Sequence, residues 1–145
     1  MYELKIKLLC SNAKLPEFAN EGDAGMDVFS IEDKIIEIGE SSLIRTGIAM
    51  ELPKNTEIQV RPKSGLALKN GITLLNSPGT IDEGYRGELK IILINHGREK
   101  FHVKDGMKIA QIVLKPIYRF KVKQVNDIDC ETQRGECGFG SSGLL

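Results

Sequence analysis

Residues 2–8 read Tyr-Glu-Leu-Lys-Ile-Lys-Leu, with an apolar side chain at every second position and a charged one between each pair. This two-residue period is typical of a β-strand that has one buried and one exposed face. The alternation returns over residues 118–125, where Tyr118, Phe120 and Val122 alternate with basic residues. We therefore expect strands near both ends of the chain.

Short segments between these two also have strand character, and turn signals such as Asn70-Gly71 and Asp105-Gly106 separate them. Residues 107–113 fit helical spacing too, but their short length, the preceding turn and Pro116 favour a strand. Residues 64–69 are expected to form one helical turn. About ten short strands and almost no helix predict an all-β sandwich or barrel. The eight further strands are expected at 24–29, 34–38, 42–52, 57–60, 72–75, 87–95, 100–103 and 108–114.

The composition is that of one soluble domain. The chain has 145 residues, of which 41% are hydrophobic and 28% charged, and its formal net charge is zero. Zero net charge argues against a dedicated nucleic-acid binder, which usually carries a basic excess. Basic residues dominate after residue 60 and acidic ones before it, so an anion site is expected in the second part.

The three cysteines cannot form a closed set of disulfides, and with only two histidines a structural zinc site is not expected. The sequence contains no signal peptide and no stretch of membrane-spanning length. These features predict a reduced, cytoplasmic protein without a membrane partner.

Five stretches interrupt the strand pattern with glycine, charged and polar residues. Each alone also fits an ordinary turn, and the composition of residues 134–145 alone predicts disorder. Together they place basic residues beside accessible backbone N–H groups, as a polyphosphate requires, with aspartates suited to Mg²⁺ and one aromatic face for a base. A nucleotide or polyphosphate site is therefore expected. The stretches are 23–27 (DAGMD), 61–67 (RPKSGLA), 76–87 (NSPGTIDEGYRG), 108–111 (KIAQ) and 134–143 (RGECGFGSSG).

In order and spacing, the five stretches resemble the five motifs of the trimeric deoxyuridine triphosphatases (dUTPases), over nearly the whole chain. The resemblance implies a jelly-roll-like β fold, a homotrimer with sites at subunit interfaces, and Mg²⁺-assisted cleavage of dUTP to dUMP and pyrophosphate. Such an enzyme keeps uracil out of DNA and supplies dUMP for dTMP synthesis. Residues 1–145 would then form one domain, whose tail, 134–145, closes over a neighbouring site.

The resemblance also implies roles for residues of the third motif. Asp82 would activate the attacking water and contact the sugar 3′-OH. Tyr85 would pack under the deoxyribose and leave no room for a 2′-OH. Asn76 would read the uracil edge, helped by the backbone of Thr80 and Ile81. Lys90 falls where bacterial members also touch substrate.

Further roles fall on the other motifs. Asp27 resembles a residue that orients Mg²⁺-bound waters, and Gln111 resembles a phosphate contact. The phosphate-contacting turn corresponds to Lys63, Ser64 and Gly65. The residues that close over uracil and the γ-phosphate correspond to Arg134, Phe139, Gly140, Ser141 and Ser142.

Three residues depart from the family pattern. Lys63 and Lys108 stand where arginine is usual, which keeps the charge and loses the bidentate fork. Cys137 stands where the tail motif has glycine, which costs strain if that position needs positive φ.

Two alternative functions have the same scaffold. A dCTP deaminase would need a deaminating Glu and different residues in place of Asp82 and Tyr85. A non-catalytic, dUTPase-like binding module could lose Asp82 or the tail arginine, and this chain keeps both.

Overall fold

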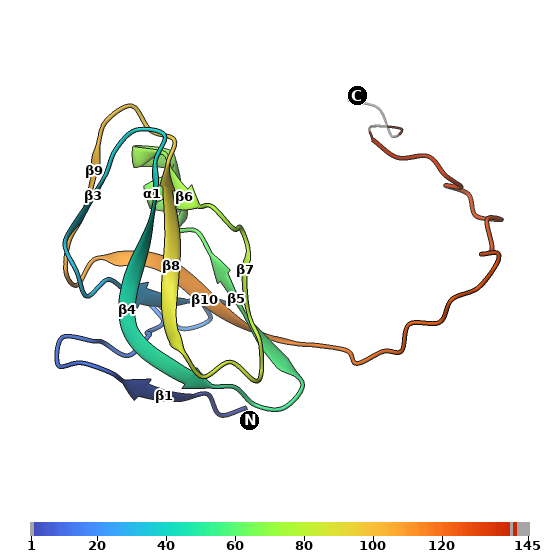
Figure 1. The fold of residues 1–145 in the computed structure, drawn as a ribbon, viewed down its shortest axis with the longest axis horizontal. Helices are drawn as coiled ribbons and strands as arrows, with labels where there is room; N and C mark the ends of the chain where they lie inside the picture. The colour runs from blue at the N-terminus through green and yellow to red at the C-terminus, as the bar shows by residue number, and fades with distance from the viewer. Residues whose placement is uncertain (1, 140, 142–145) are drawn as a thin grey trace.

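The structure, a computed structural model, describes residues 2–139 and 141. Two four-stranded antiparallel sheets form its body (Figure 1). The first has the order β1 (Lys5–Leu8), β4 (Ser41–Glu51), β8 (Glu88–Asn95), β6 (Ile72–Leu74). The second has the order β2 (Met26–Phe29), β10 (Lys108–Pro116), β5 (Thr56–Arg61), β7 (Gly79–Ile81). A small third sheet pairs β3 (Lys34–Ile36) with β9 (Phe101–Val103).

The core is built from alternate residues of the strands. Buried and partly exposed side chains alternate along β5, and the same pattern covers most of β8. Ile44 and Ile91 from the first sheet, and Ile58 and Ile112 from the second, have almost no exposed surface. Burying such side chains from both sheets in one cluster is what holds the sheets together.

Strand β4 lies between β1 and β8 and contains a bulge. It pairs with β8 through residues 41–45 and again at Ala49, and with β1 through residues 48–51, and its register with β8 shifts between Arg45 and Ala49. Gly47 lies in the bulge with φ of +68°, and a Cβ there would come within 2.8 Å of the Ala13 and Cys10 side chains. Both the backbone angle and the space therefore require glycine at this position.

The predicted all-β fold is confirmed. Residues 107–113 lie largely within β10 and do not form a helix. The expected helical turn is present as α1 (Ser64–Asn70), which ends at Gly71. Gly71 has φ of +67°, and its N–H donates to the last turn of the helix. Within residues 2–139 and 141, no helix combines the length and apolar character that a membrane crossing requires.

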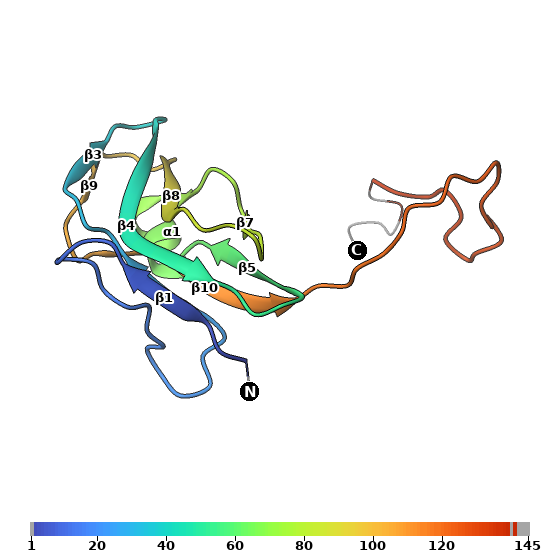
Figure 2. The same ribbon diagram turned by 60° about the horizontal axis from the view of Figure 1, so that its bottom comes forward.

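The prediction of a strand over residues 118–125 is wrong for the single chain. After β10 the chain leaves the body and runs outward in an extended path (Figures 1 and 2). Tyr118, Phe120 and Val122 are 91%, 83% and 90% exposed. The apolar and basic residues do alternate, but a strand needs a hydrogen-bonded neighbour, and this segment has none among the described residues.

Candidate active site

The third motif forms a braced loop between β7 and β8. The backbone N–H of Tyr85 donates to the Asp82 carbonyl (3.0 Å), and the Arg86 guanidinium donates to the carbonyls of Glu83 (2.7 Å) and Tyr85 (2.9 Å). The Glu83 carboxylate accepts from the Asn55 N–H and from Arg119. The Asn55 N–H is the larger cause that holds the pKa of Glu83 below its ordinary value. The loop beside Asp82 is therefore held at both of its flanks.

Six predicted site residues gather at this loop. Thr80, Ile81, Asp82, Tyr85 and Lys90 line one hollow together with Glu88. An adjoining hollow shares Thr80, Ile81 and Lys90 and adds Asn76. We call the two together the β7–β8 hollow. Asp82 lies at its rim with an exposed carboxylate, so a water molecule can reach it.

The other predicted binding residues gather in a second hollow, between β2 and the start of α1. This β2–α1 hollow has a volume of about 450 Å³. The Gln111 amide is oriented by its donation to the Pro62 carbonyl (2.9 Å), and Gly25 leaves the space that its side chain occupies. Predicted site residues that line this hollow are Asp27, Lys63, Ser64, Gly65 and Gln111.

Asp27 is the most buried charged group of this hollow, at 6% exposure. One of its carboxylate oxygens pairs with Lys63, and the other accepts from Lys108 at 3.0 Å. Burial alone would raise the pKa of Asp27, but the hydrogen bonds and charges of the two lysines outweigh it and hold the pKa below its ordinary value. The Asp27 hydrogen bond is in turn the chief reason why the pKa of Lys108 is raised. Asp27 is therefore an ionised anchor for two cations.

The two hollows share no lining residue, and the described residues of the tail line neither of them. Arg134 donates to the Cys137 carbonyl within the tail, Ser141 donates its N–H to the Gly138 carbonyl, and Phe139 is fully exposed. Gly140 and Ser142 lie outside the described residues. One chain thus separates predicted site residues into three groups.

The ion pair of Lys108, a residue of the fourth motif, with Asp27 was not predicted, and neither was the place of Glu88 in the β7–β8 hollow. Lys108 reaches Asp27 because β10 pairs with β2, a register that the sequence alone does not reveal. Glu88 lines the β7–β8 hollow. The sequence could have predicted the position of Glu88, because Glu88 precedes Lys90 by two positions and a strand places such residues on one face.

No group of three or more His, Cys, Asp or Glu side chains suited to a metal occurs in the described part of the chain. A metal ion can also bind where a protein offers fewer ligands. Mg²⁺ commonly binds in this way, through one or two carboxylates together with substrate phosphates and water.

Comparisons with known proteins agree with this geometry. A family model described as dUTPase matches residues 11–143. A deoxyuridine 5′-triphosphate nucleotidohydrolase of Clostridium tetani is 63% identical over 142 residues, covering 98% of this chain and 97% of that protein.

Solved structures agree as well. The dUTPase of Staphylococcus bacteriophage 80alpha, a G164S mutant with dUpNHpp, superposes with a TM-score of 0.91 at 30% identity, over 98% of this chain and 99% of that one. A D95N mutant dUTPase from phage phi11 of S. aureus, described with a structural Mg(II) ion, gives a TM-score of 0.80 at 28% identity, over 86% and 97%. The jelly-roll-like fold, the family match and the 63% identity show that the chain belongs to the dUTPase family and is an enzyme, a dUTP diphosphatase.

Proposed function

We propose that the enzyme hydrolyses dUTP to dUMP and pyrophosphate by attack of water on the α-phosphate, with Asp82 as the general base. The observation that carries the proposal is the gathering of Asn76, Asp82 and Tyr85 along the β7–β8 hollow. A carboxylate open to water, beside an amide suited to a base edge and a ring suited to a sugar, matches the parts of a deoxyuridine nucleotide.

Base recognition is assigned to Asn76 and to the backbone of Thr80 and Ile81. Strand β7 is the edge of its sheet and, among residues 2–139 and 141, pairs only with β5. The backbone groups of an edge strand that face away from its neighbour can hydrogen-bond a ligand. The uracil edge carries both donors and acceptors, as such a strand does. Lys90, on the neighbouring rim, would contact the same nucleotide.

Phosphate binding is assigned to the β2–α1 hollow, through Lys63, Ser64, Gly65 and Gln111. The lysine, the hydroxyl and the second N–H of the Gln111 amide all donate hydrogen bonds, as phosphate oxygens require. Gly65 has open space where a Cβ would lie and does not have positive φ. The fold therefore does not need glycine there, whereas a phosphate approaching the backbone would.

The residues present fit an Mg²⁺ ion that is held mainly by the triphosphate. A carboxylate accepts about four hydrogen bonds, and the two lysines use only part of the capacity of Asp27. Asp27 would orient metal-bound waters with the rest. When bound, the ion would neutralise charge on the phosphates.

We propose a homotrimer in which each site combines the β7–β8 hollow, the β2–α1 hollow and a tail from different chains. The support is that the two hollows share no residue and that the extended segment after β10 exposes its alternating apolar side chains. The single domain of residues 1–145 would then lend residues 134–145 to a neighbour. There Arg134, Phe139, Gly140, Ser141 and Ser142 would close over uracil and the γ-phosphate.

The reaction would keep uracil out of DNA and supply dUMP for dTMP synthesis. The three free cysteines support the reducing cytoplasm as its location. Neither nucleic acid nor a membrane is proposed as a partner.

The test is product analysis with Mg²⁺ and dUTP, UTP or dCTP as separate substrates. We expect dUMP and pyrophosphate from dUTP alone. Ammonia released from dCTP would identify a deaminase instead. Binding of dUTP without turnover would identify a non-catalytic binding module.

A further inference from the structure

We propose that Gly87 and the backbone carbonyl of Glu88 form a seat that fixes the Tyr85 ring, and that this seat sets how strictly the enzyme rejects a ribose 2′-OH. The inference rests on the proposed role of Tyr85 and adds the groups that position it. The resemblance to the family assigns no role in substrate recognition to Gly87 or Glu88.

The first half of the seat is empty space at Gly87. A Cβ on this residue would overlap the Tyr85 hydroxyl and lie 2.6 Å from Cζ and 3.1 Å from Cε2. The φ of Gly87 is outside the left-handed region, so the backbone alone would accept any residue. A side chain at this position would displace the aromatic ring, because the ring folds back against Gly87.

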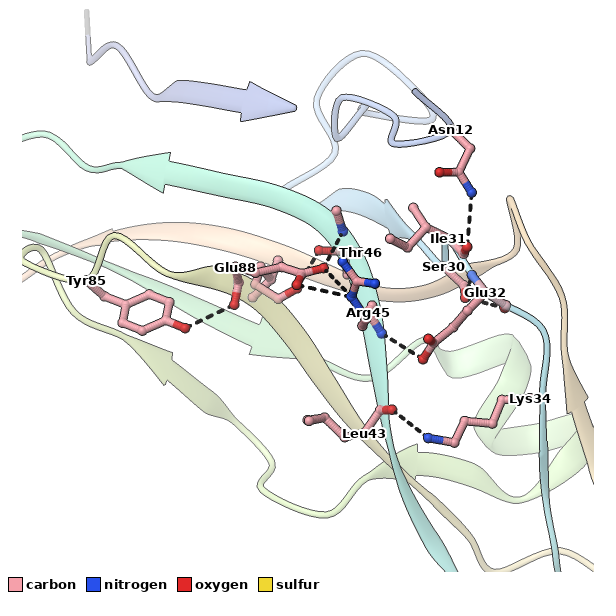
Figure 3. Close-up of polar contacts among 12 residues, drawn as sticks. Asn12, Ser30, Ile31, Glu32, Lys34, Leu43, Arg45, Thr46, Tyr85 and Glu88 are labelled. Atoms are coloured by element: carbon pink, nitrogen blue, oxygen red, sulfur yellow. Dashed lines mark hydrogen bonds and ion pairs between the residues drawn. The ribbon is translucent and has the colours of Figure 1, made fainter. Parts of the chain in front are cut away.

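The second half is the Glu88 carbonyl, which accepts a hydrogen bond from the Tyr85 hydroxyl at 3.0 Å (Figure 3). Ring and carbonyl are thus joined at the polar end of the side chain. Tyr85 is otherwise 45% exposed. A half-exposed ring without such contacts would sample more than one rotamer.

The carbonyl is itself held in place through the β4 bulge. The Glu88 carboxylate accepts from Arg45 Nε at 3.2 Å (Figure 3). It also accepts from the Gly47 N–H at 3.0 Å. The Thr46 hydroxyl donates to the carbonyl of the next residue, Leu89. These hydrogen bonds tie the start of β8 to β4, and the seat rests on this part of the sheet.

The rigidity of the Tyr85 ring affects specificity because the ribose 2′-OH is excluded by a steric clash with the ring. The clash excludes ribose only if the ring cannot move aside. A ring that can swing away still packs under deoxyribose but also admits ribose. Loss of the seat should therefore raise turnover of UTP much more than it lowers turnover of dUTP.

The experiment compares kcat/KM for dUTP and UTP in four variants. Tyr85→Ala removes the ring, Gly87→Ala fills the seat, and Tyr85→Phe removes only the hydrogen bond to Glu88. Gly84→Ala is the matched control, because Gly84 lies in the same loop and has nothing within 4 Å of its Cβ position. For Gly87→Ala we expect the dUTP preference to fall by roughly tenfold or more, a typical size for a steric contact in a specificity pocket. Tyr85→Phe should lose less, and Gly84→Ala should keep the native preference.

A thermal melt of each protein separates positioning from folding, since a purely structural role would lower Tm without changing the dUTP preference. Full discrimination by both Gly87→Ala and Tyr85→Phe, with discrimination lost in Tyr85→Ala, overturns the seat and leaves the role of Tyr85 intact. Full discrimination in Tyr85→Ala overturns the proposed role of Tyr85, and the seat with it.

Discussion

At the scale of single residues, two aspartates that both belong to motif stretches have opposite environments. Asp82 lies exposed directly after β7, where water can reach its carboxylate. Asp27 is buried between Lys63 and Lys108 and is held ionised by them. Burial and charged neighbours, rather than residue type, therefore separate a candidate base from an anchor.

Replacing Asp82 with asparagine tests the base. The amide keeps the size of the side chain but cannot accept the proton of the water, so kcat should fall by roughly 10²–10⁴-fold, the usual contribution of a positioned general base. Binding of a non-hydrolysable dUTP analogue should persist. Pyrophosphate release measures kcat, and titration calorimetry measures binding of the analogue. Glu37→Gln, a carboxylate-to-amide change at an exposed position outside both hollows, is the control. A loss of less than about threefold would remove Asp82 from this role.

Gly65→Ala should change stability and substrate affinity in opposite directions. Alanine is the better helix former, so the variant should unfold at higher temperature, by the equivalent of about 0.5–1 kcal/mol. If phosphate approaches this backbone, KM for dUTP should rise by roughly tenfold, which corresponds to about 1.4 kcal/mol. Gly71→Ala serves as the contrast, because this variant should be less stable than the native protein. Gly71 has positive φ, and a Cβ there would lie 2.6 Å from the Gly97 backbone. An unchanged KM in Gly65→Ala would separate Gly65 from the phosphates.

At the scale of elements, the pairing of β10 with β2 and β5 builds the phosphate side of the site. Gln111 is registered opposite Asp27 on one side and Arg61 on the other. This register brings Lys108 to Asp27, and the chain after Arg61 brings Lys63 to the same carboxylate. The ion pairs therefore join β2, β10 and the start of α1 at one point.

The pH dependence of stability follows from the ion pairs of Asp27 with Lys63 and Lys108. The pKa of Asp27 in the folded chain lies below the ordinary 3.8, so its stabilising effect is complete at neutral pH and is lost as the pH falls below 3.8. Asp27→Asn should lower the free energy of unfolding at pH 7 by about 1.5–3 kcal/mol, the value of a hydrogen bond to a charged group.

Urea titrations of both proteins from neutral to acid pH measure this difference, which should shrink only below pH 3.8. Glu17→Gln is the control, because its pair with Lys108 is exposed and should contribute less than about 1 kcal/mol. A difference between native and Asp27→Asn proteins that is constant down to the acid limit would contradict the assignment.

At the scale of the whole molecule, the predicted site residues of one chain lie in separate places. The two hollows share no lining residue, and the chain after β10 leaves the body of the two sheets (Figures 1 and 2). A symmetric ring would bring each part of one chain to a different part of the next, and would repeat the arrangement at every interface.

Mixing two inactive proteins tests the shared site. One is full-length Asp82→Ala, and the other keeps Asp82 and lacks residues 134–145. A site works when its Asp82 comes from the truncated chain and its tail from the full-length one. With random assembly each condition holds half the time, so about a quarter of the sites should recover. Zero recovery after co-refolding, with mixing confirmed by native mass spectrometry, would reject a site shared between chains.

Much of this protein was predictable from the sequence alone. A two-residue period is a local property, so the strands and the all-β fold followed from it, as did β10 at a segment that also fits helical spacing. The order of the five motifs identified the family. The strand pattern and each single motif depend on residues that are near one another in the chain, and the order of the motifs can be read along it without knowing which segments pair.

Only the tertiary structure decided which of those residues meet. The contact between Asp27 and Lys108 depends on the pairing of β2 with β10, and the seat of Tyr85 depends on a bulge in β4, neither of which local pattern encodes. The segment from Tyr118 to Val125 shows the same difference between local sequence pattern and long-range pairing. Its alternation was visible in the sequence, but a strand forms only where another strand offers hydrogen bonds, and within the described chain none lies beside it. Sequence therefore determined what each segment can form, and long-range pairing determined which segments formed it and which side chains share a site.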